Sequence, residues 1–168
     1  ALKVTEGEEN DEFLITRLGH VVPAINILNV YGGIENRMSK QEVTENWVRI
    51  KKEISKISQR EEALVLIGDC NRAIGNDCLG VKGNHSNISH GGSMIRELLE
   101  DEEYFLANSL DIAEGGPWTW VSRADRTVKS CLDLVILSSN LKPYVSKVMI
   151  DSEQKLCAKK VGITKGKE

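Results

Sequence analysis

The stretch Ala63-Leu64-Val65-Leu66-Ile67-Gly68-Asp69-Cys70-Asn71 decides the fold of this 168-residue chain. Five apolar residues followed by a glycine are typical of a strand that is buried on both faces of a sheet. Asp69 and Asn71 come directly after this strand, and residues two apart point the same way while the chain stays extended. The carboxylate can hold or deprotonate a water, and the carboxamide can donate to a phosphate oxygen or an oxyanion. The alternative is an Asx turn that closes the strand.

The regions on either side of this strand predict a mixed α/β fold. Extended segments are expected over residues 13–16 and 20–31, where β-branched apolar residues roughly alternate. Residues 41–60 have the spacing of an amphipathic helix, which the capping box of Ser39 and Glu42 begins. We expect a second helix over residues 93–100 and further strands over residues 104–108, 118–122, 131–137 and 145–150. This order of elements favours helices layered on a sheet.

The composition indicates a single globular domain. The chain has 22 Lys and Arg against 25 Asp and Glu, a net charge of −3 and 40% hydrophobic residues. These values exclude an acidic tail protein, a histone-like polycation and a low-hydrophobicity disordered chain. The first residues do not resemble a signal peptide, and no run approaches the roughly 20 apolar residues of a membrane span. The four cysteines are scattered without a C-x-x-C pair, so we expect reduced thiols in a cytoplasmic or nuclear protein that is not secreted and has no membrane partner.

Three further places carry candidate functional side chains. Asp133 is the one carboxylate in the apolar run at residues 131–137, so it either faces solvent or serves a partner, because an unpaired buried charge costs several kcal/mol. Trp118-Thr119-Trp120 forms either a core strand or the wall of a groove. Tyr31 and Arg37 form either a phosphate-contacting pair or an ordinary strand-end tyrosine with a surface arginine.

Four motifs in order resemble the endonuclease/exonuclease/phosphatase superfamily, which includes deoxyribonuclease I and the apurinic/apyrimidinic endonucleases. The motifs are N-V-Y at 29–31, I-G-D-C-N at 67–71, W-T-W at 118–120 and S-C-L-D-L-V-I-L-S at 130–138. The resemblance is closest to the endonuclease domains that precede reverse transcriptase in non-LTR retrotransposons. It covers roughly residues 10–152.

The resemblance implies an α+β fold of four layers, α/β/β/α, in which two sheets form a sandwich of the deoxyribonuclease I-like type, here incomplete. It implies cleavage of a DNA phosphodiester by an in-line water, with Mg²⁺ stabilising the leaving oxygen. Asp69 would orient or deprotonate that water, Asn71 would contact the scissile phosphate and Tyr31 would hydrogen-bond a phosphate oxygen. Asp133 would orient the catalytic histidine of the family.

The resemblance also implies substrate contacts around this site. Asn84, in the Gly/Asn-rich loop, would be an additional phosphate or DNA contact, while Arg37 is a candidate phosphate contact only through its pairing with Tyr31. Thr119 and Trp120 would support the groove.

The departures from the family pattern concern the two ends of the site. Glu6, Glu8 and Glu9 do not match the metal-binding Glu of the family, and no S-D-H segment follows residue 152. We expect the three histidines, His20, His85 and His90, to be surface residues and not a replacement base. Arg72 also stands where the family usually has a small residue.

Several function classes therefore remain open. The chain is a Mg²⁺-dependent endonuclease or an inactive fragment of one, a phosphatase acting on inositol or lipid phosphates, or a non-catalytic binding module derived from a retroelement. Without the metal Glu and the histidine, we expect this polypeptide alone to have little or no nuclease activity. We expect one partial domain over residues 1–168, with flexible ends at 1–10 and 158–168, and self-association through open sheet edges.

Overall fold

The computed structural model describes most of the chain between residues 4 and 150. The described residues are 4–10, 13–19, 21, 23–75, 77–79, 88–115, 118–122, 124–125, 127 and 129–150, with side chains omitted for residues 4–10 and 79. Among these residues, no helix is long and apolar enough to cross a membrane.

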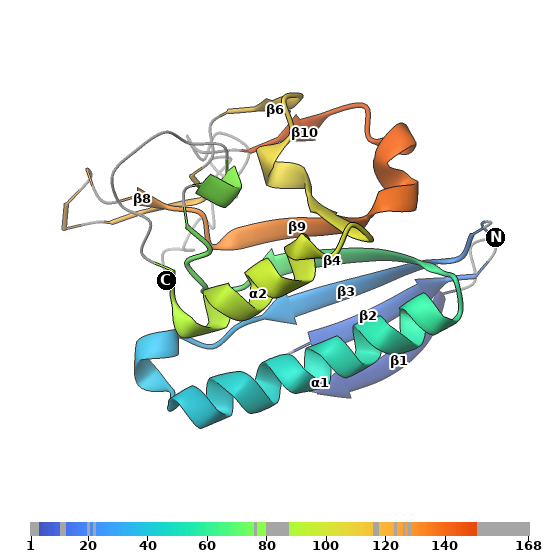
Figure 1. Ribbon diagram of the computed structural model, residues 1–168, viewed down its shortest axis with the longest axis horizontal. Coiled ribbons are helices and arrows are strands. Elements are labelled where there is room, and N and C mark those ends of the chain that lie inside the picture. The colour runs from blue at the N-terminus through green and yellow to red at the C-terminus, as the bar shows by residue number, and fades with distance from the viewer. Residues whose placement is uncertain are drawn as a thin grey trace, which may run out of the picture.

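A six-stranded sheet is the centre of the fold (Figure 1). Its strand order is β1-β2-β3-β4-β9-β5, where β3 and β4 pair in parallel and the other neighbours are antiparallel. The strands are β1 (Val4–Asn10), β2 (Phe13–Leu18), β3 (Ile25–Tyr31), β4 (Ala63–Asp69), β9 (Asp133–Ser138) and β5 (Tyr104–Leu106). The two apolar strands expected from sequence, β3 and β4, are thus neighbours in the middle of the sheet.

Two helices cover one face of this sheet. Helix α1 (Lys40–Gln59) connects β3 to β4, and α2 (His90–Glu100) lies beside it on the same face (Figure 1). The predicted capping box is confirmed, because the Ser39 side chain accepts from the Glu42 amide and the Glu42 side chain accepts from the Ser39 amide. The predicted stripe of α1 is entirely buried, and its members are Val43, Trp47, Ile50, Ile54 and Ile57. Except for Val43, these residues belong to one core cluster with the inward-facing side chains of the strands, among them Leu28, Leu64, Leu66, Leu134 and Ile136.

Short elements complete the described part of the chain. Two two-stranded pairs form, β6 (Ala113–Glu114) with β10 (Val148–Met149) and β7 (Trp120–Val121) with β8 (Lys129–Ser130). The 3₁₀ helices are η1 (Glu35–Arg37), η2 (Asp77–Leu79), η3 (Ala107–Ser109) and η4 (Ser139–Tyr144).

Several element boundaries differ from the prediction. The second helix begins at His90 and not at residue 93, because the Ser89 side chain accepts from the Gly92 amide and caps it there. The sequence did not predict a helix start at His90, because Gly91 and Gly92 follow it and glycine has a low helix propensity. The strand expected over residues 118–122 shortens to β7, and the one over residues 145–150 shortens to β10. The edge strand β1 was not predicted, because its sequence is polar and acidic.

Candidate active site

Three of the predicted site residues lie in one row across three neighbouring strands. The register of β3 and β4 places Tyr31 opposite Asp69, and the register of β4 and β9 places Asp69 opposite Asp133. Tyr31 ends β3, Asp69 ends β4 and Asp133 begins β9, so all three lie at the same end of the sheet. Residues that are directly opposite each other share a face, so these side chains can act on one bound group.

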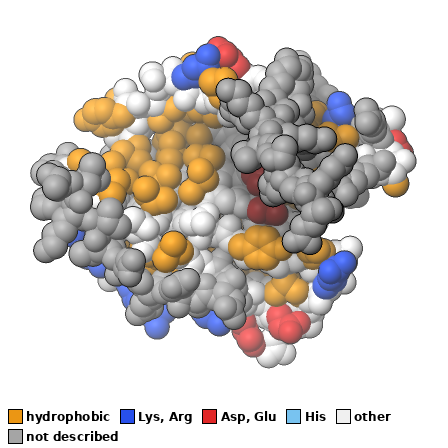
Figure 2. All heavy atoms as spheres, turned by 180° about the vertical axis from the view of Figure 1, so that it is seen from behind, with side chains coloured by type: hydrophobic (Ala, Val, Ile, Leu, Met, Phe, Trp, Pro, Cys, Tyr) orange, Lys and Arg blue, Asp and Glu red, His pale blue; other side chains and the backbone are white. Residues whose placement is uncertain are grey.

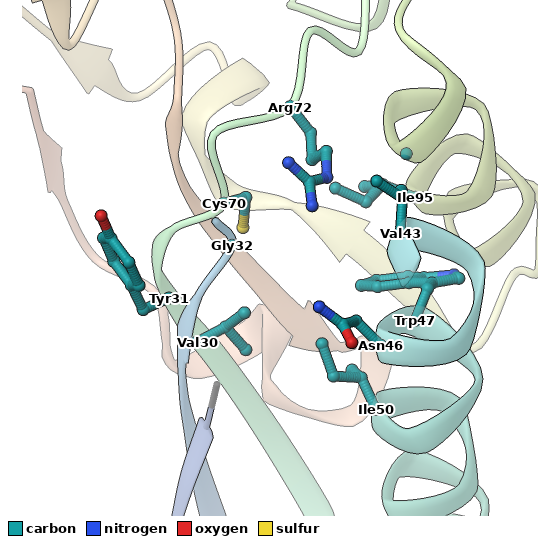
Figure 3. Close-up of a pocket in the computed structure, with 11 residues that line it drawn as sticks. Val30, Tyr31, Gly32, Val43, Asn46, Trp47, Ile50, Cys70, Arg72 and Ile95 are labelled. Atoms are coloured by element: carbon teal, nitrogen blue, oxygen red, sulfur yellow. The ribbon is translucent and has the colours of Figure 1, made fainter. Parts of the chain in front are cut away.

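The row points to the face of the sheet that the helices do not cover. Its inner neighbours Val30 and Leu134 are buried in the core with α1 and α2, and alternation along the strands turns the row the other way. Figure 3 shows the Tyr31 ring pointing away from Trp47 and Arg72 on the helix side. Tyr31 is 56% exposed, and the Asp133 residue is exposed as well. Among the described residues, the two outer members of the row are therefore exposed, while Asp69 between them is half-buried.

Acidic and apolar side chains share this outer face. Figure 2 shows a broad group of hydrophobic side chains over the sheet, with acidic side chains beside them in a hollow. Leu14 of β2 and Ile67 of β4 belong to this face and are 37% and 40% exposed.

Glycine allows β3 and β4 to approach closely next to the row. Gly68 has φ of +144°, and a Cβ there would lie 2.0 Å from the carbonyl oxygen of Val30. Only glycine adopts this conformation without strain. The Gly32 amide then donates to the carbonyl oxygen of Asp69 over 2.8 Å, which extends the pairing past the end of the row.

Asn71 lies in a tight turn directly after the row. Its amide donates to Oδ1 of Asp69 over 3.0 Å, and its φ is +49°, a left-handed conformation that asparagine tolerates better than most residues. The Asx turn that sequence analysis kept as the alternative is thus present. The turn also holds one oxygen of Asp69 in place and keeps Asn71 next to it, so the two interpretations are compatible.

The environment of Asp69 favours its protonated form. Burial raises the pKa of this carboxyl above its ordinary value, and the neighbouring charge of Asp133 raises it further, while the hydrogen bond from Asn71 opposes the shift. A carboxylate with a raised pKa is a better proton acceptor at neutral pH than an exposed aspartate.

Thr119 and Asn108 hold the first residues of β9. Oγ1 of Thr119 accepts from the amides of Leu132 and Asp133, each over 3.0 Å. The buried carboxamide of Asn108 accepts from the Val135 amide over 2.8 Å and donates to the Asp133 carbonyl over 3.1 Å. Asn108 thereby pairs with β9 as a peptide group would, at the point where β5 has already ended. Asn108 was not among the predicted site residues, because no local sequence pattern marks it for this role.

The remaining predicted residues lie apart from the row. Arg37 is an exposed residue of η1, and Trp120 lies in β7 with 43% of its surface exposed. No contact that the structure gives among the described residues joins either of them to the row. Asn84 lies outside the described residues, as do His20 and His85.

His90 is the one histidine that the structure describes. Its Nε2 lies 2.9 Å from Oγ1 of Thr44, at the start of α2 on the helix side of the sheet. It therefore lies apart from the row, and it is half-buried, whereas sequence analysis expected a surface residue.

A small apolar cavity lies behind the strand ends and is separate from the row (Figure 3). Its volume is about 20 Å³, enough for about one water, and it is lined by side chains of α1, α2 and the inner strand positions, including Val30, Trp47 and Cys70. Tyr31 is one of the lining residues, while its ring points outward. The cavity faces the core and not the candidate active site.

No family model matches the chain, and no curated protein matches it in sequence. Solved structures do match. A 3′-5′ exonuclease from Neisseria meningitidis is 20% identical with a TM-score of 0.58, and the match covers 84% of this chain and 60% of that one. A 3′ phosphatase from Neisseria, bound to a product DNA hairpin, is 17% identical with a TM-score of 0.55 and the same coverage. An AP endonuclease from Leishmania major is 18% identical with a TM-score of 0.54, covering 82% of this chain and 49% of that one.

The fold is deoxyribonuclease I-like. This confirms the α+β fold class that the motifs implied. At these identities the likeness concerns the fold, and the chain spans from about half to three fifths of the length of the structures it matches.

Proposed function

We propose that the chain hydrolyses DNA phosphodiesters as a Mg²⁺-dependent endonuclease, with its reaction centre on the row of Tyr31, Asp69 and Asp133. The observation that carries the proposal is the register, which aligns two carboxylates and a phenol on the open face of the sheet. A deoxyribonuclease I-like fold supports a phosphodiester as the substrate bond. A structural neighbour that is bound to a DNA hairpin supports DNA as the substrate.

The residues of the row and of the turn after it have different roles in the proposed reaction. Asp69, with its raised pKa, orients the attacking water and accepts its proton. The Tyr31 hydroxyl and the Asn71 carboxamide donate to phosphate oxygens and stabilise the negative charge that develops there. Thr119 and Asn108 hold Asp133 through its backbone, so that its carboxylate stays in the row.

The residues of the row fit a Mg²⁺ ion that is shared with the substrate. Mg²⁺ prefers oxygen ligands and is usually held by one or two carboxylates together with substrate phosphates. Asp133 offers such a carboxylate beside Asp69, which holds the attacking water, and no group of three His, Cys, Asp or Glu side chains comes together among the described residues. When bound, the ion would stabilise charge on the leaving oxygen.

The test is nicking of supercoiled plasmid. We expect slow nicking that requires Mg²⁺ and that falls by about 10²-fold or more in Asp69→Asn, the range for loss of a general base. The matched control is Asp111→Asn, because Asp111 is an exposed aspartate outside the row. Nicking that Asp69→Asn leaves unchanged, or a wild-type chain that does not nick DNA, contradicts the proposal.

A second candidate function is phosphomonoester hydrolysis. It is favoured by the 3′ phosphatase among the structural neighbours and by the fact that the same Asp and Asn groups can serve either reaction. A panel of plasmid, 3′-phosphorylated duplex and inositol phosphates separates the two functions. Binding of DNA without turnover of any of these substrates would favour the non-catalytic module.

We also propose a retroelement origin and self-association. The order of the four sequence motifs supports an endonuclease of the non-LTR retrotransposon type, and a reverse transcriptase reading frame in the same coding sequence would test it. Strand β1 lies at one edge of the described sheet and Leu14 and Ile67 are exposed on its outer face, which supports pairing with a second copy. Light scattering that gives only the 18.7 kDa monomer would contradict self-association.

A further inference from the structure

Arg72 is a buried arginine that the proposed chemistry does not use. Only 6% of its surface is exposed, although it follows directly on Asn71 of the turn. Its Nη1 donates to the carbonyl oxygen of Gly33 over 2.6 Å and to that of Asn71 over 3.2 Å. One guanidinium nitrogen thus joins the segment that leaves Tyr31 to the turn that follows Asp69.

The rest of the guanidinium contacts the segments that surround these two loops. Nε lies 3.7 Å from Oε2 of Glu35, and Nη2 lies 3.9 Å from Sδ of Met38. Glu35 in turn accepts from the Gly91 amide through Oε1 over 3.1 Å, so the first turn of α2 is included. A Cβ at Gly91 would lie 2.3 Å from both Cδ and Nε of Arg72, which shows how closely the helix packs on this side chain. Figure 3 shows the guanidinium on the helix side, opposite the direction of the Tyr31 ring.

We propose that Arg72 is a positioning residue that fixes the segment directly after Tyr31 relative to the turn after β4 that carries Asn71. The guanidinium is a planar fork with five donors in fixed directions, so it can hold two carbonyl oxygens and a carboxylate in one geometry. Gly33 lies two residues after Tyr31, and the carbonyl of Asn71 belongs to the turn whose amide holds Asp69. Through these contacts Arg72 sets the spacing between Tyr31 and the turn that carries Asn71.

The contacts suit positioning better than stabilisation. A buried ion pair often contributes little net stability, because desolvation offsets the attraction between its charges. Here the carboxylate lies at 3.7 Å, and its Oε2 is buried without a hydrogen-bond partner. The shorter contacts are those to the two loop carbonyls, so the arrangement favours defined loop geometry.

The experiment compares amide hydrogen exchange in variants of the full chain. The reporters are the Gly32 and Asn71 amides, which donate to the backbone oxygen and to Oδ1 of Asp69, and the Leu66 amide of the central strand reports global opening. The variants are Arg72→Met, Arg72→Lys and Gly91→Ala. Gly91→Ala keeps both charges and adds one methyl group that must displace Arg72, at a helical position where alanine is otherwise favourable.

The matched control is Arg96→Met. Arg96 also joins a backbone carbonyl and a carboxylate, donating to Ile74 O over 3.1 Å and to Oδ1 of Asp77 over 2.8 Å, but it contacts neither site loop. It therefore reports what the loss of such an arginine does to the fold as a whole.

We expect exchange at Gly32 and Asn71, relative to Leu66, to become at least about tenfold faster in Arg72→Met and Gly91→Ala, and to stay unchanged in Arg96→Met. Arg72→Lys should restore the melting temperature but not the slow exchange, because an ammonium lacks the fork. If Arg72→Met does not fold, Gly91→Ala and Arg72→Lys decide the question. The inference is overturned if Gly91→Ala leaves exchange at the Gly32 and Asn71 amides unchanged, or if Arg72→Lys fully restores slow exchange there.

The catalytic consequence of this inference rests on the proposed function. If the chain nicks DNA, kcat should fall about tenfold in Gly91→Ala with KM nearly unchanged, while Arg96→Met changes neither. A higher KM with an unchanged kcat would overturn the positioning role. Because exchange needs no turnover, an inactive wild-type chain contradicts the proposed function and leaves the exchange result to decide on Arg72.

Discussion

Replacing Asn108 with leucine should destabilise the fold by about 2–4 kcal/mol. The Asn108 carboxamide serves two backbone groups of β9, the Val135 amide at 2.8 Å and the Asp133 carbonyl at 3.1 Å. Leucine is similar in size but satisfies neither group, and a buried polar group that loses its partner costs about 1–3 kcal/mol. The two losses together come to about 2–6 kcal/mol. Because the Asp133 residue is exposed, water can replace part of the bond to its carbonyl, which brings the expected loss to about 2–4 kcal/mol.

Urea unfolding followed by circular dichroism measures this loss. For a domain of this size, a change of 2–4 kcal/mol corresponds to a drop in melting temperature of roughly 4–16 °C. The control is Asn140→Leu, because Asn140 is an exposed asparagine of η4, where a substitution is expected to stay within about 0.5 kcal/mol. If Asn108→Leu unfolds at the same urea concentration as this control with the same slope, Asn108 does not serve as a peptide substitute for β9.

Three further predictions follow from the charges and thiols. A hydrogen bond from Arg17 lowers the pKa of Glu62 to about 2, from an ordinary value of 4.5. The stability that this carboxylate contributes is therefore present above pH 4.5 and is lost as the pH falls toward 2. The difference in the free energy of unfolding in urea between wild type and Glu62→Gln should shrink over that pH range. A difference that stays constant would contradict this prediction. Burial raises the pKa of Asp69, so the ionised carboxylate opposes folding, and Asp69→Asn should raise the melting temperature at pH 7 but not at pH 3. Calorimetry at both pH values measures this change. A lower melting temperature of Asp69→Asn at pH 7 would refute the prediction. Burial raises the pKa of Cys70 and of Cys131 to about 12, so both thiols should react with a disulfide reagent only as fast as the protein unfolds, and rapid labelling of either in the native protein would show that it is accessible.

Local periodicity predicted the elements whose stability comes from one amphipathic or apolar segment. The stripe of α1 and its capping box are confirmed because both depend on residues three or four apart within one helix. Strands β7 and β10 are shorter than expected because a strand extends only over the residues that pair with a neighbouring strand, and each of these pairings is two residues long. Strand β1 forms by pairing with the free edge of β2, and the polar sequence of β1 gives no sign of that pairing.

The local arrangement at the end of β4 follows from the sequence alone. Asp69 and Asn71 are two residues apart, so their proximity is a local property of the chain, and so is the Asx turn between them. The tertiary structure decided which other groups join them, because the strand register brings Tyr31 and Asp133 into line with Asp69 from distant parts of the chain. It also decided the roles of Arg72 and Asn108: a buried donor or acceptor is costly until a partner meets it, and those partners come together only when the loops and strands pack.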